Sequence, residues 1–188
     1  MLPIQGGPAI KRLSLFVVVV LVQVIAVALP AAAGSQGAPT SSDPLPLPPG
    51  QELVWKVVGK GVQIYDCMPS PTDPTTKVWT FREPAAVLYQ HGRPVGIHFR
   101  GPTFESFDGS SVVGALVASV PAPRPGAIPW LLLQAVSTQG DGVLSNVDYI
   151  KRVKTKGGVA PAGACDPAQD STLSVPYRAQ YEFYADAA

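Results

Sequence analysis

The sequence is poor in the residues that most enzymes use for catalysis. It holds two histidines and two cysteines among 188 residues, and only 14% of its residues are charged. No C-x-x-C pair is present, which excludes the usual zinc and thiol-redox motifs. No G-x-S-x-G elbow is present either, which argues against an α/β-hydrolase. We therefore expect neither a metal nor a cofactor.

Helical signals are also missing beyond residue 50. No window there carries a convincing apolar period of 3.6 residues, whereas short strand-like runs recur between turns rich in glycine and proline. This pattern predicts an all-β fold, a single and mainly antiparallel β-sandwich or barrel domain with proline-rich loops. Two of the expected strands, Leu53–Val58 and Val62–Cys67, are separated by a turn at Gly59–Gly61. That glycine pair lacks the third glycine and the helix of a dinucleotide site.

The N-terminal residues have the features of a signal peptide. Lys11 and Arg12 precede a long apolar run over residues 13–29, and Ala31–Ala33 supplies a small-residue cleavage site. We expect a signal peptide over residues 1–33 and a secreted or extracellular protein. The alternative is a membrane anchor formed by residues 13–29, because the run is almost long enough to span a bilayer.

The remaining chain divides into a proline-rich linker over residues 34–50 and a β domain over residues 51–188. Without the signal segment the net charge is (14 − 2) − 13 = −1, since the segment carries two cations and no acid. A nearly neutral domain gives no reason to expect nucleic acid as a partner. A small basic cluster is explained by a solvated hairpin, with an anion site as the alternative; it contains Lys151, Arg152, Lys154 and Lys156.

The stretch Gly92–Val120 contains the densest strand and turn signals. Residues 95–99 alternate in polarity, residues 103–107 form a second short strand, and residues 112–120 form a third. The last is apolar nearly throughout and is predicted to be buried on both faces. Together the three strands predict a β-meander.

This meander also holds the candidate catalytic residues His98, Glu105 and Asp108. A histidine with two carboxylates suits acid/base chemistry or a divalent metal. The competing interpretation is structural: His98 bonds a neighbouring strand, and Asp108 serves only its turn. We favour the structural interpretation, and we predict that His98 lies on the polar side of its strand, opposite Ile97 and Phe99.

The C-terminal strand over residues 175–185 carries an aromatic ladder. Tyr177, Tyr181 and Phe183 share one face, which predicts core packing in a sheet. The alternative is a platform on which a sugar stacks. Tyr177 and Tyr181, together with Arg100 of the meander, are therefore the candidate ligand-binding residues.

Cys67 and Cys165 are the only cysteines, and an even number in an exported chain permits complete pairing. We expect them to form a disulfide that closes a loop of 98 residues. In the chain-entropy model such a crosslink contributes about 4–5 kcal/mol of stability.

Several motifs resemble those of the secreted family catalogued as domain of unknown function 3455. They span the β domain in order and read GKGVQIYDC at residues 59–67, GIHFRGPTFESFDGS at 96–110, IPWLLL at 128–133, YIKRVKTKGG at 149–158 and VPYRAQYEFY at 175–184. The resemblance implies a small secreted or cell-surface protein with no established activity. It supplies no catalytic residue for this chain.

Taken together, these features favour an extracellular binding or structural module. Its partner would be a cell-wall or extracellular ligand, such as a small molecule or a carbohydrate. The alternative is a small secreted enzyme, a hydrolase or a metal-dependent enzyme, that uses His98 with Glu105 and Asp108. A membrane is a partner only if residues 13–29 are retained.

The leader generates the first prediction. If the signal peptide is removed, N-terminal sequencing of material from the medium should begin near Gly34. Recovery of the protein from membranes with the residues before Leu29 intact would favour the anchor instead.

Overall fold

The computed structural model describes residues 43–187, which form eight β-strands and no helix. The predicted signal segment and most of the predicted linker lie outside these residues. The strands are β1 (Gln51–Pro69), β2 (Lys77–Gln90), β3 (Arg93–Phe99), β4 (Thr103–Ser106), β5 (Ser111–Val120), β6 (Trp130–Gln139), β7 (Tyr149–Gly157) and β8 (Thr172–Asp186).

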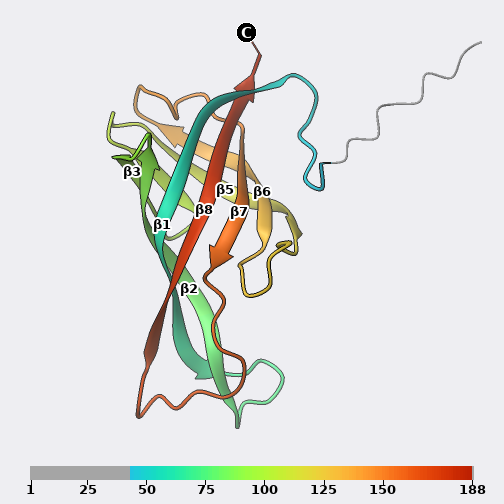
Figure 1. The fold of residues 1–188 in the computed structure, drawn as a ribbon, viewed down its shortest axis with the longest axis vertical. Coiled ribbons are helices and arrows are strands. Elements are labelled where there is room, and N and C mark those ends of the chain that lie inside the picture. The colour runs from blue at the N-terminus through green and yellow to red at the C-terminus, as the bar shows by residue number, and fades with distance from the viewer. Residues whose placement is uncertain (1–42, 188) are drawn as a thin grey trace, which may run out of the picture. The chain divides into compact units, whose positions relative to one another are not determined.

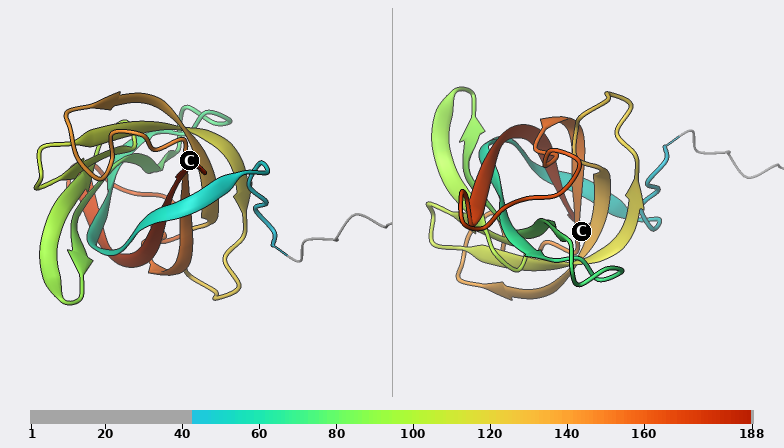
Figure 2. Two further views of the ribbon diagram at one scale, coloured as in Figure 1. Left: turned by 90° about the horizontal axis from the view of Figure 1, so that it is seen from above. Right: turned by 90° about the horizontal axis from the view of Figure 1, so that it is seen from below.

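Each strand pairs antiparallel with the next along the chain, and β8 returns to pair with β1, so that the sheet closes into a barrel (Figure 1). The view along the axis shows the ring of strands directly (Figure 2). The predicted all-β class is confirmed, with closure into a barrel in place of two packed sheets. Closure pairs the edges of the sheet that an open arrangement would expose.

β1 is one continuous strand, so the predicted turn at Gly59–Gly61 is wrong. Gly59 points into the barrel, where a Cβ atom would lie 2.6 Å from the ring of Tyr181. Gly61 also points inward, and a Cβ there would collide with the backbone of Ala85 on β2. The glycines therefore make room inside a bent strand, which sequence alone does not distinguish from a turn.

The interior is filled by side chains, as expected for a barrel of eight strands. Phe104, Tyr181 and Phe183 are completely buried, and the ring of Phe104 meets those of Tyr181 and Phe183 edge to face, at 5.0 Å and 5.2 Å between centroids. Trp55 packs on Phe183 from β1 at 5.1 Å. Aromatic pairs of this geometry contribute about 0.5–1.5 kcal/mol each beyond the area they bury.

The meander of β3, β4 and β5 is present, but β5 is not buried on both faces. Val112 is fully buried, whereas Leu116 and Val117 are 62% and 53% exposed. Leu116 and Val117 are consecutive and lie beside the register shift between Leu116 and Ala118, where β5 pairs with β6. Both apolar side chains therefore remain in solvent.

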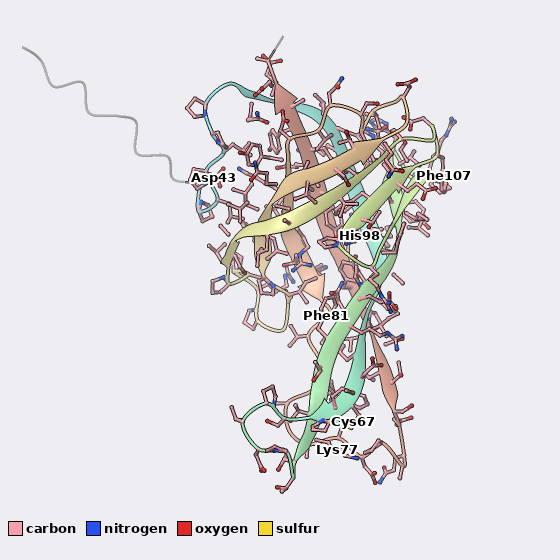
Figure 3. All side chains as sticks on the ribbon, turned by 180° about the vertical axis from the view of Figure 1, so that it is seen from behind. Asp43, Cys67, Lys77, Phe81, His98 and Phe107 are labelled. Carbon is pink, nitrogen blue, oxygen red and sulfur yellow. A yellow bond between two sulfur atoms is a disulfide. The ribbon has the colours of Figure 1, made fainter. Side chains whose placement is uncertain are left out.

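At one end the barrel continues into a three-stranded extension made of residues 62–69, 77–85 and 172–176 (Figure 1). Here β2 and β8 have no neighbouring strand other than β1, because their pairing with β3 and β7 ends earlier. The predicted disulfide between Cys67 and Cys165 is present in the extension, with Cα atoms 5.9 Å apart (Figure 3). It ties the loop before β8 to the middle strand.

The chain ahead of β1 packs on the outside of the barrel. Leu45 is completely buried, and the carboxylate of Asp43 accepts a hydrogen bond from the ammonium of Lys151 on β7. Lys151 is itself 5% exposed. The end of the predicted linker is therefore part of the fold.

The disulfide generates a prediction. Cys67→Ser combined with Cys165→Ser should lower the unfolding free energy by about 4 kcal/mol, because the unfolded chain regains the entropy of a 98-residue loop. For a domain of this size that is a drop in Tm of about 10 °C. Calorimetry with and without reductant would measure it, and an unchanged Tm in both experiments would contradict the prediction.

Candidate functional site

His98 lies inside the barrel, so its predicted place on a polar outer side is wrong. β3 turns Ile97 and Phe99 outward and His98 inward, where it is 3% exposed. Its ring stacks on Phe104 at 4.0 Å between centroids and at an angle of 3°. Its Nδ1 lies 2.8 Å from the carbonyl oxygen of Thr103 on β4. The structural interpretation, in which His98 bonds a neighbouring strand, describes this geometry.

Burial lowers the pKa of His98 from 6.5 to about 4, because the cation would lose its hydration. The hydrogen bond to Thr103 opposes this shift, and the guanidinium of Arg152 adds to it. His98 is therefore a neutral ring packed in the core at physiological pH.

The two carboxylates do not join His98. Glu105 pairs with Ile97 across β3 and β4 and is exposed on the outer face. Asp108 lies in the turn after β4. Within residues 43–187 no group of three or more histidine, cysteine, aspartate or glutamate side chains is placed to hold a metal ion. The candidate catalytic residues are thus separated by the wall of the barrel.

Asp108 fastens two loops at one end of the barrel. Its carboxylate accepts hydrogen bonds from the Ser110 hydroxyl at 2.6 Å and from the Val143 N–H at 2.9 Å. Partial desolvation raises the pKa of Asp108, but these hydrogen bonds outweigh it and lower the pKa to about 2. Ser110 is fully buried and accepts a further bond from Leu144 N–H. Asp108 therefore has a structural role beyond its own turn, because it connects that turn to the loop before β7.

The proposed sugar platform is inside the core. Tyr177 is 5% exposed and Tyr181 is completely buried, so neither ring can receive a ligand from solvent. Their hydroxyl groups lie 3.1 Å apart, and burial raises the pKa of both phenols. The core-packing interpretation describes these residues.

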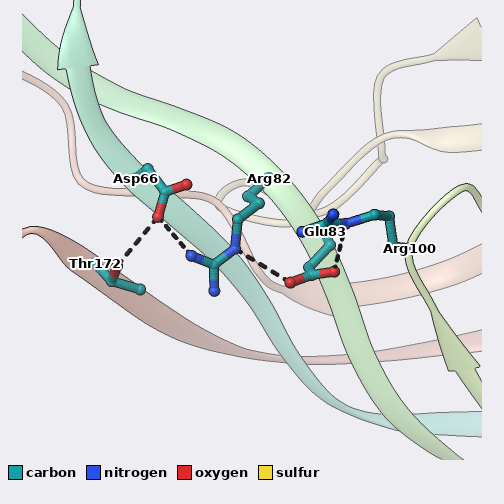
Figure 4. Close-up of polar contacts among 5 residues, drawn as sticks. All are labelled: Asp66, Arg82, Glu83, Arg100 and Thr172. Atoms are coloured by element: carbon teal, nitrogen blue, oxygen red, sulfur yellow. Dashed lines mark hydrogen bonds and ion pairs between the residues drawn. The ribbon is translucent and has the colours of Figure 1, made fainter.

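Arg100 is exposed, but its charge is already neutralised. Its Nε donates to Glu83 at 2.9 Å, Glu83 also accepts from Arg82, and Arg82 donates to Asp66 at 2.8 Å (Figure 4). Thr172 completes the chain of contacts with a bond to Asp66 at 3.1 Å. This network connects β1, β2 and β8 in the extension with the turn after β3. It leaves Arg100 no unpaired charge for a ligand.

A row of cations that the sequence did not indicate crosses the outside of the barrel. Lys60 on β1 lies opposite Arg178 on β8, and Arg178 lies opposite Lys156 on β7. All three are exposed. None of them takes part in an ion pair with an acid in the described part of the chain.

Another row across the same strands shows the contrast. There Lys56 on β1 lies opposite Glu182 on β8, which lies opposite Lys151 on β7. The charges alternate, and the ammonium of Lys56 is 3.3 Å from the carboxylate of Glu182. Like charges on directly opposed residues destabilise a sheet. The cationic row therefore destabilises the sheet, whereas the alternating row does not.

Two hollows are lined by Lys156 of the cationic row. The larger has a volume of about 590 Å³ and is lined by Pro123, Arg124, Trp130, Lys154, Thr155 and Lys156. The smaller, of about 150 Å³, is lined by Val58, Lys154, Lys156, Arg178, Ala179 and Gln180. Lys154 and Lys156 thus line both. We call Lys60, Arg124, Lys154, Lys156 and Arg178 together the basic surface.

The backbone at the basic surface is irregular. Lys154 has a φ of 51°, which is uncommon for a residue with a side chain. It lies in a bulge between Val153 and Lys156, where β7 loses register with β8. Bulges of this kind redirect side chains and are frequent beside functional sites. Here the bulge brings Lys154 to the same two hollows as Lys156.

The fold and the site define a class of protein: a closed, eight-stranded antiparallel barrel with a filled interior and a basic patch outside. Residues 48–93 and 90–185 match a family described as protein of unknown function (DUF3455), and the chain belongs to that family. The match confirms the resemblance seen in the motifs. No curated protein and no solved structure matches the chain. Among the described residues, no helix is long and apolar enough to span a membrane.

Because of His98, the stability of the folded protein should depend on pH. The unfolded chain binds a proton at His98 below about pH 6.5, whereas the folded protein does not until about pH 4. Stability should therefore fall as the pH falls from 6.5 to 4, by at most about 3 kcal/mol. Chemical denaturation at several pH values would measure the slope.

Two variants isolate the contribution of His98. His98→Phe should be less stable near neutral pH, because the Thr103 carbonyl loses its partner, but its stability should depend less on pH over this range. His91→Phe, on the exposed turn between β2 and β3, should keep the wild-type slope. An equal slope in wild type and His98→Phe would contradict the assignment.

Proposed function

We propose that this protein is an exported binding module whose basic surface holds an acidic polysaccharide of the extracellular space. The observation that carries the proposal is the row of Lys60, Arg178 and Lys156, in register across three strands and without an acidic partner among residues 43–187. Repulsion among these three cations destabilises the free sheet. An anion that binds to them relieves this repulsion.

The shape of the basic surface suits an extended ligand. Neighbouring strands lie about 4.8 Å apart, so the row of three cations is about 10 Å wide. Lys154 and Arg124 continue the positive charge into the larger hollow. A polymer with a carboxylate on successive sugar units can contact several of these cations at once. Each of these exposed ion pairs contributes little binding free energy by itself.

The composition of the domain favours a local site over general attraction to anions. Residues 34–188 carry a net charge of (14 − 2) − 13 = −1. A nucleic-acid-binding domain is usually strongly basic overall. Here five cations gather on one surface of a nearly neutral protein, which supports a ligand that contacts that surface alone.

Export of the protein remains part of the proposal. It is supported by the basic residues, the apolar run and the small-residue cluster at the N-terminus, and it agrees with a disulfide in the fold. An acidic polymer in a cell wall or matrix is a ligand that such a protein would meet. His98, Glu105 and Asp108 are separated, so no reaction is proposed for them.

The test is binding of polygalacturonate, with neutral dextran as the control polymer. Binding measured by affinity electrophoresis or calorimetry should weaken as salt rises, because exposed charges are screened. Arg178→Glu with Lys156→Glu should weaken binding at least about tenfold, which is about 1.4 kcal/mol.

A matched control changes the net charge equally elsewhere. Arg93→Glu with Lys77→Glu removes two exposed cations, one beside the β2–β3 turn and one at the far end of the extension (Figure 3). This pair should retain most of the binding. If both pairs lose affinity equally, the attraction is general; if polygalacturonate binds no better than dextran, the proposed function is wrong.

A further inference from the structure

Another cavity is lined by Phe107, which lies at the end of the barrel opposite Cys67 of the disulfide (Figure 3). It has a volume of about 420 Å³, which is within the range of small-molecule sites. It is lined by Trp55, Gln90, Pro94, Val95, Ser106, Phe107, Asp108 and Val143. None of these residues belongs to the basic surface, so this cavity is a separate feature of the protein.

Phe107 is the most exposed aromatic residue of the lining. Its side chain is 63% exposed, although burying a phenylalanine contributes about 2 kcal/mol or more to stability. Its position is fixed all the same: the N–H of Phe107 donates to Val95 on β3 at 2.9 Å, and Asp108 beside it is held by Ser110. The fold thus presents an aromatic ring to solvent from a well-fastened turn.

The cavity combines this ring with a second aromatic residue and with polar groups. Trp55 lies at the wall, nearly buried and backed by Phe183. Gln90, Ser106 and Asp108 are the polar residues of the same lining. The Gln90 amide also donates to the Lys56 carbonyl, and the Asp108 carboxylate also accepts from Ser110 and Val143. An aromatic ring has a negative face, and it attracts the weakly positive C–H groups on one face of a sugar ring. The hydroxyl groups around the edge of that sugar then need polar partners.

Irregular backbone surrounds the cavity as well. β1 has a bulge between Leu53 and Trp55 where it pairs with β8. β2 loses register with β3 between Leu88 and Tyr89, just before Gln90. Bulges re-aim side chains and are frequent next to binding sites. Both are adjacent to residues that line the cavity.

From these observations we propose that the cavity binds the ring of a neutral sugar, stacked on Phe107. An uncharged ligand is favoured because no lysine or arginine lines the cavity, and the one charged residue is the carboxylate of Asp108. Trp55 and Lys60 are five residues apart on β1, which is about 16 Å along a strand. The sugar site is therefore independent of the basic surface.

The test uses three neutral oligosaccharides as probes: cellotetraose, chitotetraose and mannotetraose. Binding of at least one of them to the purified protein should change the tryptophan fluorescence, because Trp55 lines the cavity. Phe107→Ala should weaken that binding about tenfold or more. Phe107→Leu should be almost as weak, since leucine keeps the apolar bulk but has no aromatic face.

Phe81→Ala is the matched control, because Phe81 is also an exposed phenylalanine, 51% accessible, but lies in the extension (Figure 3). It should leave binding of the sugar unchanged. Arg178→Glu with Lys156→Glu should also leave it unchanged, whereas Phe107→Ala should keep binding of polygalacturonate. The two proposals can therefore fail separately.

Three results would overturn the proposal of a sugar site. The first is that none of the three probes binds at millimolar concentration. The second is that a probe binds equally to wild type and Phe107→Ala. The third is that the protein sediments as a dimer that Phe107→Ala dissociates, since Phe107 would then be a contact between two copies of the chain.

Discussion

The rest of the structure depends on the pairing between the first and the last strand. β1 and β8 run side by side from Gln51–Asp186 to Asp66–Thr172, which is the longest ladder in the barrel. This ladder closes the ring and gives every strand an inner and an outer face. It also continues past β3 and β7 into the extension, where β2 runs beside β1. The disulfide then fastens the loop before β8 to that same pair of strands.

Closure decides which residues are available to a ligand. Because side chains alternate along a strand, one register fixes the inside and the outside of the whole ring. His98, Tyr177 and Tyr181 point inward and become packing residues. The cations of β1, β7 and β8 point outward and meet across the ladder. The basic surface is thus formed by strands that are far apart in the sequence.

Much of the fold could be predicted from local patterns. Alternation at residues 95–99 and 175–185 located two strands, and the sharing of one face by Tyr177, Tyr181 and Phe183 was correct. The inward face of β3 was not predictable, because Ile97 and Phe99 are more apolar than His98 and suggested the opposite orientation. The glycines of β1 resembled a turn because the sequence does not show the ring of Tyr181 that they accommodate.

The site was harder to predict than the fold for a related reason. The sequence showed Lys154 and Lys156 as part of a basic cluster. The other two members, Lys151 and Arg152, are not part of the basic surface. Lys151 is buried beside Asp43. Arg152 donates to the carbonyl of Pro129. Lys60 and Arg178 join the cluster only through the register of β1 and β8. Clustering in sequence is therefore a poor guide to clustering in space when the sheet is closed.

The ladder between β1 and β8 also has a consequence for the order in which the protein forms. Its partners are separated by more than 100 positions, and contacts so distant in the chain make folding slow. The barrel cannot close until the last strand is synthesised, so a growing chain stays open throughout translation. Cys67 and Cys165 come within bonding distance in this closed arrangement. An oxidising compartment that receives the chain before it closes would lock the barrel at the moment of completion.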